Sequence, residues 1–144
     1  MKDKKLSAEI EFPVEFYDVD SMNIVWHGNY LKYFEKARCA LLEKIGYGYP
    51  QMTESGYAFP VTDIRVKYVS PLSFQQRVRA TATLEEYESI LRISYILQDA
   101  QTGKVATKGR SSQAAVKIAT GTPCFDCPAI LIQRVRAAME AEGL

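Results

Sequence analysis

Two carboxylates and the start of a long helix come close together in the first part of the chain. Asp18 and Asp20 end an alternating segment, and an apolar helix is predicted to begin at about Asn29. The connection between them is short, so the helix start returns to the end of the strand. Free amides and the dipole of a helix start attract negative charge. The sequence therefore predicts one small site in which a carboxylate meets anion-stabilising amides.

This pairing suits the hydrolysis of a thioester. Asp20 can activate a water molecule or attack the carbonyl carbon itself. The oxyanion can be held by amides at the helix start, those of His27, Gly28 or Asn29. A thiol with a pKa of about 8.5 leaves without a strong acid. The chain has one histidine and no Gly-x-Ser-x-Gly motif, which agrees with a reaction that needs no Ser-His-Asp triad. No metal and no cofactor is implied, and coenzyme A enters only as part of the substrate.

Periodicity predicts the strand that carries these aspartates. Four apolar residues of one parity are expected on its core side: Ile10, Phe12, Val14 and Phe16. Pro13 removes one ladder donor and favours an edge position. If the parity continued, both aspartates would share the core face, where a carboxylate needs a neighbour that favours its charge.

The helix is predicted from about Asn29, as N-cap, to Ile45, with Gly46 as its stop. Its apolar residues extend well around its circumference, which indicates a helix wrapped by a sheet. Four further strands and a closing helix are predicted over Tyr57–Val69, Gln76–Tyr87, Ile90–Asp99, Lys104–Ala119 and about Pro128 to Glu142. A long central helix wrapped by a five-stranded antiparallel sheet is the α+β hotdog fold.

Size and composition limit the class of protein. A chain of 144 residues suits one domain, 1–144, and a formal net charge of +1 argues against a general nucleic-acid binder. No apolar run is long enough for a membrane span, and no apolar signal core follows the basic start Met1–Lys5, so a cytoplasmic protein is expected. Two exposed sheet edges predict a homodimer, or a dimer of dimers.

The cysteines do not form the framework of a secreted protein. Cys39, Cys124 and Cys127 are three in number, and reduced thiols are the default expectation. Cys124 and Cys127 have the spacing of a redox or zinc half-site. A structural zinc site wants four ligands, and the sequence has no second pair. Two ordinary thiols are the stronger interpretation.

One long stretch carries a family resemblance. Residues Phe16–Leu31, continuing into Tyr33–Arg38, resemble the signature of 4-hydroxybenzoyl-CoA thioesterase-type hotdog proteins, especially the acyl-CoA thioesterase branch associated with bacterial Tol–Pal clusters. The resemblance implies that Asp20 is catalytic and that the amide of His27 polarises the carbonyl. Ile64–Leu72 resembles the second strand and following loop of the family. The implied substrate is an acyl-CoA or an acyl carrier protein.

Further residues are assigned to substrate binding: Val25, Trp26, Gly28, Asn29, Tyr30, Arg65 and Lys67. The last two belong to a series of basic residues that alternate with apolar ones on the predicted strands. These residues can bind nucleotide phosphates, bind an acidic carrier protein, or simply form a solvated face of the sheet. Asn23 stands where the family usually has glycine, and asparagine tolerates a positive φ better than most residues.

Plainer interpretations of the same residues remain open. Asp20 can cap a turn, and Asp18 is more naturally a ligand of amides in its own turn. A second hotdog branch places its acid on the long helix, which makes Glu35 a rival base. The plainer role for Glu35 is an ion pair with Arg38. The ring of His27 is a weaker candidate than its amide.

Two other functions compete with hydrolysis. A hotdog module can bind an acyl thioester without cleaving it, and a hotdog dehydratase acts on hydroxyacyl carriers. The dehydratases pair a histidine with an acid in a proline-rich loop, and the sequence around His27 has no such prolines. Release of free thiol from acyl substrates separates hydrolysis from binding.

Overall fold

The computed structural model describes residues 4–144, so the first three residues of the basic start Met1–Lys5 lie outside the described residues. In chain order the elements are β1 (Ser7–Pro13), the 3-10 turns η1 (Phe16–Asp18) and η2 (His27–Asn29), α1 (Tyr30–Lys44), α2 (Tyr49–Glu54), β2 (Tyr57–Ala58), β3 (Val61–Tyr68), β4 (Arg77–Glu86), β5 (Leu91–Asp99), β6 (Val105–Gln113), β7 (Val116–Lys117), β8 (Thr122–Pro123) and α3 (Ala129–Ala141).

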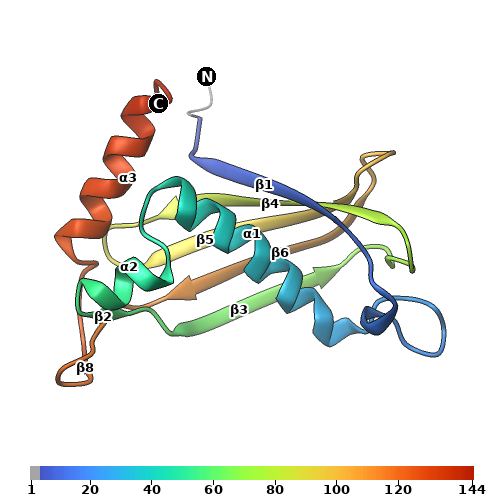
Figure 1. Cartoon of the computed structure of the whole chain (residues 1–144), viewed down its shortest axis with the longest axis horizontal. Helices are drawn as coiled ribbons and strands as arrows, with labels where there is room; N and C mark the ends of the chain where they lie inside the picture. Colours follow the sequence, from blue (N-terminus) through green and yellow to red (C-terminus); the bar gives the residue numbers. More distant parts are fainter. Residues whose placement is uncertain (1–3) are drawn as a thin grey trace.

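The main sheet has five strands in the order β1-β4-β5-β6-β3, and all neighbours are antiparallel. The helix α1 crosses one face of this sheet, and α3 stands at the end where α1 stops (Figure 1). A second small sheet, β2-β7-β8, was not expected from the sequence. One long helix against a curved antiparallel sheet is the hotdog arrangement, which confirms the predicted α+β fold class.

Alternation along the strands builds the core under α1. On β4 and β5 every second residue is buried: Val78, Ala80, Ala82, Leu84, Leu91, Ile93, Tyr95 and Leu97. From the helix, Phe34 stacks on Tyr95 with ring centroids 4.6 Å apart. Gly109 of β6 leaves room for this ring, because a Cβ there would lie 2.4 Å from Phe34. The small residues of the sheet therefore set how closely α1 approaches.

The first strand differs from its prediction at its end. Ile10 and Phe12 do face the helix side, opposite Ala80 and Val78, and β1 is an edge strand as Pro13 indicated. The prediction for Phe16 was wrong, because the strand ends at Pro13 and η1 turns Phe16 outward, where 75% of it is exposed.

The predicted bounds of the other elements hold with local exceptions. The predicted strand Tyr57–Val69 is broken into β2 and β3 around Pro60, which cannot donate to a ladder. The predicted strand Lys104–Ala119 ends at Gln113, and a separate short strand, β7, follows. Asn29 does occupy the predicted N-cap position of α1, but its side chain makes no capping bond and donates to the Asp18 carbonyl instead.

Candidate active site

Asp18 joins the end of the first strand to the start of the long helix. It is 4% exposed, and its Oδ2 accepts hydrogen bonds from the Glu15 amide at 3.0 Å and the Tyr33 hydroxyl at 2.8 Å. Its carbonyl oxygen accepts from the Trp26 amide at 3.0 Å and from Asn29 Nδ2 at 2.8 Å. Burial and the bond to Asp18 raise the pKa of Tyr33, so this hydroxyl stays a donor. Asp18 thus has the structural role that the plainer interpretation gave it.

Asp20 stands on a tight loop between η1 and η2. Its amide donates to the Ile24 carbonyl at 2.9 Å, and its carbonyl accepts from the Asn23 amide at 3.0 Å. Asp20 Oδ1 also accepts from the Met22 amide at 2.8 Å, which is the turn-capping role considered above. Asn23 has φ of +62°, so it adopts the left-handed conformation that asparagine tolerates better than most residues. These bonds fix the carboxylate at the tip of the loop.

The helix start presents His27 beside this loop. η2 begins at His27 and runs directly into α1, and its first hydrogen bond is donated by the Asn29 amide to the Trp26 carbonyl at 2.8 Å. The amides of His27 and Gly28 precede that bond, so the helix itself offers them no carbonyl. The Trp26 ring lies over Gly28, where a Cβ would come within 2.2 Å of it.

A cavity of about 460 Å³ joins these features. Asp20, Val25, His27 and Tyr30 all contribute to its wall, and this brings together four of the predicted site residues. The rest of its wall comes from the same loop and from the segment after β3: Met22, Ile24, Tyr68, Val69, Ser70 and Pro71. We call this space the Asp20 cavity. Its mostly apolar wall with one carboxylate can take an acyl chain whose carbonyl stands near Asp20.

Two tyrosines hold the floor of the Asp20 cavity in place. The Tyr68 hydroxyl donates to the His27 carbonyl at 2.8 Å. Tyr30 packs edge-on against Tyr68 at 5.1 Å between centroids, and its hydroxyl accepts from the Leu72 amide at 3.4 Å. Burial raises the pKa of Tyr30. Sequence reasoning gave Tyr68 no role, although it lies inside the stretch that resembles the family, because its contact with His27 spans distant segments.

The other predicted substrate-binding residues lie outside the wall of this cavity. Trp26 is 51% exposed and covers Gly28, while Asn29 is buried and bound to Asp18. Arg65 and Lys67 lie on the outer face of β3, since the residues between and beside them face α1.

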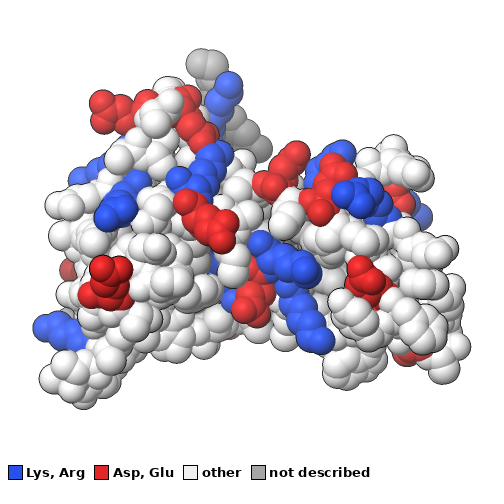
Figure 2. All heavy atoms as spheres, viewed as in Figure 1, with Lys and Arg blue, Asp and Glu red and all other residues white. Residues whose placement is uncertain are grey.

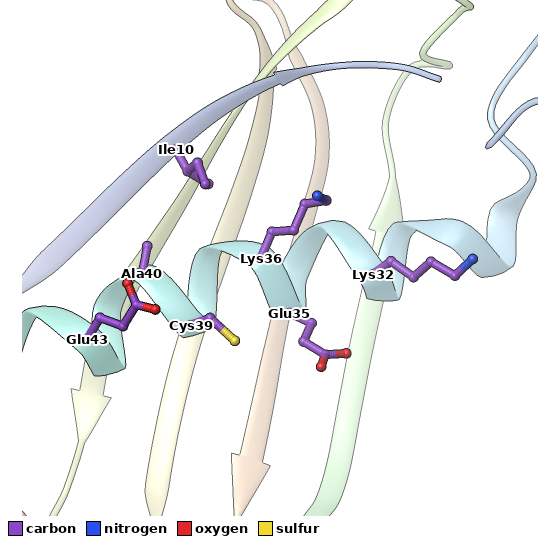
Figure 3. Close-up of a pocket in the computed structure, with 7 residues that line it drawn as sticks. All are labelled: Ile10, Lys32, Glu35, Lys36, Cys39, Ala40 and Glu43. Carbon is purple, nitrogen blue, oxygen red and sulfur yellow. The ribbon is translucent and has the colours of Figure 1, made fainter. Parts of the chain in front are cut away.

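Glu35, the rival base, belongs to a different groove. Figure 3 shows it on the solvent face of α1 with Lys32, Lys36 and Cys39, around a groove of about 450 Å³ that shares no wall residue with the Asp20 cavity. Figure 2 shows that charges of both signs are interleaved over this face. The prediction of an ion pair between Glu35 and Arg38 was wrong.

Arg38 instead turns into the core. It is 7% exposed, and it donates to the Tyr49 hydroxyl at 2.8 Å and to the Tyr95 hydroxyl at 3.3 Å. No salt bridge joins it to any carboxylate in residues 4–144. The two phenol oxygens take the place of a counter-ion.

The cysteines are free thiols in the structure. Cys127 is buried, and burial raises its pKa to about 12. Among the described residues, no group of three or more histidines, cysteines, aspartates or glutamates stands close enough to hold a metal ion. No helix within 4–144 has the length and apolar character needed to cross a membrane.

Comparison with known proteins decides the family. The sequence profile of the thioesterase-like superfamily matches residues 14–139, which include every residue that lines the Asp20 cavity. The chain belongs to this superfamily. Membership confirms both the predicted hotdog thioesterase family and the predicted class of enzyme, a thioester hydrolase. The narrower Tol–Pal-associated branch stays a prediction.

One sequence relative and two solved structures illustrate the match. YneP of Bacillus subtilis, whose name assigns it provisionally as an acyl-CoA thioesterase, is 31% identical over 107 residues, 74% of this chain and 77% of that protein. A DHNA-CoA thioesterase from Staphylococcus aureus is 25% identical with a TM-score of 0.79, covering 96% of this chain and 95% of the other. The Staphylococcus aureus protein SAV2348, solved in complex with CoA, has a TM-score of 0.83 at 15% identity, covering 97% and 88%, and supports the fold alone.

Proposed function

We propose that this protein hydrolyses an acyl-CoA thioester in the Asp20 cavity, with Asp20 as base or nucleophile and the amides at the start of η2 as oxyanion donors. The observation that carries the proposal is the common wall: Asp20 and His27 line one apolar cavity at the start of a long helix. The names of YneP and of the DHNA-CoA thioesterase support the substrate class.

The reaction needs one carboxylate and one pair of donors. As base, Asp20 takes a proton from water while the water oxygen bonds to the thioester carbon, and the amides of His27 and Gly28 stabilise the oxyanion. The C–S bond then breaks and the thiolate takes the proton back, which gives a carboxylic acid and free coenzyme A. As nucleophile, Asp20 attacks the thioester carbon and the C–S bond breaks, which releases the CoA thiolate and leaves an acyl anhydride; water then cleaves the anhydride, and the proton that Asp20 gains passes to the thiolate. Neither route asks for a cofactor.

The active unit is proposed to be a homodimer that pairs through β3, with a dimer of dimers as the larger form. β3 is an edge strand, and three apolar side chains along it are partly exposed: Val61 at 45%, Ile64 at 36% and Tyr68 at 51%. Since Tyr68 lines the Asp20 cavity, a partner at this edge would complete the cavity wall. The free thiols suit a reducing compartment such as the cytoplasm.

Thiol release from a panel of aliphatic and aryl acyl-CoA substrates tests the proposal. Asp20→Asn keeps the shape of the loop and the hydrogen bond to Met22 but removes the base. We expect kcat to fall about 10²- to 10⁴-fold with little change in KM, the range found for loss of a general base. Mass spectrometry of the wild type during turnover separates an acyl-enzyme from direct attack by water.

Glu35→Gln is the matched control, because it makes the same change at the rival acid. Its kcat is expected to stay within about twofold of wild type, since a surface substitution in a separate groove alters little. Full turnover by Asp20→Asn, or a collapse of kcat in Glu35→Gln alone, would move the chemistry out of the Asp20 cavity. Binding of acyl-CoA without thiol release by the wild type would favour the non-catalytic module.

A further inference from the structure

Four cations stand together on the outer face of the main sheet, the face opposite α1. The register sets Arg65 of β3 opposite Arg110 of β6, and Lys67 opposite Lys108. They point away from the helix, because Gly109 between the two rungs faces α1. Opposite side chains have Cβ atoms about 5 Å apart, and the next rung on the same face lies about 7 Å along the strand. These four residues, named the cation block here, therefore occupy one small patch.

Only one of the four residues of the cation block has a carboxylate at ion-pair distance within residues 4–144. Arg65 has Asp63 at 3.9 Å. Glu85, which accepts a hydrogen bond from Ser94 beside Arg110, lies close enough for Arg110 to help lower its pKa. Within residues 4–144 no carboxylate lies at ion-pair distance from Lys67, Lys108 or Arg110.

On the β1–β4 half of the same face, by contrast, Arg77 and Arg79 of β4 both donate to the single carboxylate of Glu11 on β1, each at 3.3 Å. Like charges directly opposite one another are destabilising, so the block weakens the sheet unless an anion covers it.

Protection of the sheet edge does not account for the block. Lysine and arginine on an edge strand discourage edge-to-edge association, which is a sufficient reason for Arg65 and Lys67 on β3. Lys108 and Arg110 lie on β6, which is already paired on both sides, by β3 and by β5. Protection of an open edge therefore does not explain why Lys108 and Arg110 are charged.

The shape of the block favours an extended partner over a small one. Neither the Asp20 cavity nor the groove on α1 includes any of the four residues. The amides of Lys108 and Arg110 belong to the sheet ladder, because β6 is paired on both sides. Phosphates of small ligands are usually held in concave sites with convergent amides. Beside Lys108 on β5, Ile96 is 39% exposed and adds an apolar contact that a protein surface can cover.

We propose that the cation block docks the acidic surface of a carrier protein that delivers the acyl thioester. This inference rests on the proposed hydrolysis in the Asp20 cavity and specifies a second source of its substrate. Lys67 immediately precedes Tyr68, which lines that cavity from the opposite face of the same strand. A carrier bound to the cation block lies beside the end of β3. Its thioester arm can pass around this end of the strand to reach Asp20 on the other face of the sheet. A nucleic acid is a poorer match, since the block is two rungs long in a chain of net charge +1.

The double variant Lys108→Glu/Arg110→Glu tests the docking. It turns each like-charge rung into an opposite-charge rung, so the sheet is not weakened, and the melting temperature checks this. Lys117→Glu is the matched control, an exposed lysine on β7 outside the block. Each protein is assayed with the acyl group that wild type cleaves fastest, attached to coenzyme A and to a bacterial acyl carrier protein, at low and high salt.

The expected result is a fall of at least tenfold in the ratio of kcat/KM for the carrier substrate to kcat/KM for the CoA substrate. In wild type this ratio also falls with salt, because screening weakens contacts between exposed charges. Lys117→Glu keeps the wild-type ratio. An unchanged ratio in the double variant overturns the proposal. An equal fall of kcat/KM on both substrates also overturns it, because the block would then recognise the thioester arm that the two substrates share.

A binding measurement separates failure of docking from failure of catalysis. The Asp20→Asn protein, with and without the double variant, is titrated with octanoyl-loaded acyl carrier protein and with vesicles of phosphatidylglycerol and phosphatidylcholine. Carrier binding that the double variant removes supports the docking even if wild type cleaves no thioester. Binding to the vesicles alone that the double variant removes would assign the block to an anionic membrane instead.

Discussion

Asn23 shows how one residue sets the loop that carries the candidate base. With φ of +62° it holds the left-handed conformation, and its amide and the Asp20 carbonyl close the turn at 3.0 Å. An asparagine bears this conformation at a modest energy, whereas a side chain branched at Cβ is strained there. The position of the Asp20 carboxylate therefore depends on a residue that performs no chemistry.

Substitution of this residue separates conformation from chemistry. Asn23→Gly is expected to be as stable as wild type or up to about 1 kcal/mol more stable, and Asn23→Val to be about 1–2 kcal/mol less stable. Urea unfolding measures both values. The kcat of Asn23→Gly should stay close to wild type, while that of Asn23→Val falls because the Asp20 loop shifts. Equal stability of the two variants would contradict the argument from φ.

At the scale of elements, the turn η1 that follows β1 is joined to α1 at the buried carboxylate of Asp18. The Tyr33 hydroxyl on α1 and the Glu15 amide before η1 both donate to Asp18 Oδ2. A hydrogen bond to a charged group contributes about 1.5–3 kcal/mol. The junction at Asp18 thus fixes where the helix start, and with it His27, stands relative to the loop of Asp20.

Tyr33→Phe tests this junction through the pH dependence of stability. Burial and Asp18 raise the pKa of Tyr33 in the folded protein, so its contribution is complete below the unfolded pKa of about 10 and is lost as pH rises above it. The free energy of unfolding of wild type is expected to fall above about pH 10. At pH 7 that of Tyr33→Phe is expected to be about 1.5–3 kcal/mol lower than wild type, and it should fall less steeply as the pH rises above about 10. Urea midpoints between pH 7 and about pH 11 measure both. Parallel declines would show that Tyr33 does not carry the effect.

Local patterns predicted the elements well and the site only in part. The strand predicted over Gln76–Tyr87 differs from β4 by one residue at each end, because alternation is a property of neighbouring residues. The Asp20 loop and the helix start also came from one continuous motif. The outward turn of Phe16, the role of Tyr68 and the inward course of Arg38 depend on contacts between segments far apart in the sequence, which periodicity does not contain.

At the scale of the whole molecule, the proposed dimer is open to a matched test. Ile64 on β3 and Ile10 on β1 are exposed to nearly the same extent, 36% and 37%, on the two opposite edge strands. Sedimentation of wild type is expected to give at least twice the chain mass of 16.2 kDa. Ile64→Glu is expected to give the single-chain mass and to lose most of the activity, and Ile10→Glu to keep the wild-type mass. Dissociation by Ile10→Glu alone would move the contact to β1.

The two edges of the sheet are not equivalent, and this limits how far the protein can polymerise. β1 ends in Pro13 and carries Glu9 and Glu11, so another strand finds a missing donor and negative charge there. β3 has no proline between Val61 and Tyr68. In the proposed dimer, β3 pairs with β3 of a second copy and leaves no open edge, so the sheet itself grows no further than a pair, and a dimer of dimers has to form through its faces. The same asymmetry would place the edge next to the Asp20 cavity inside the pair and leave only the proline-blocked edges outside.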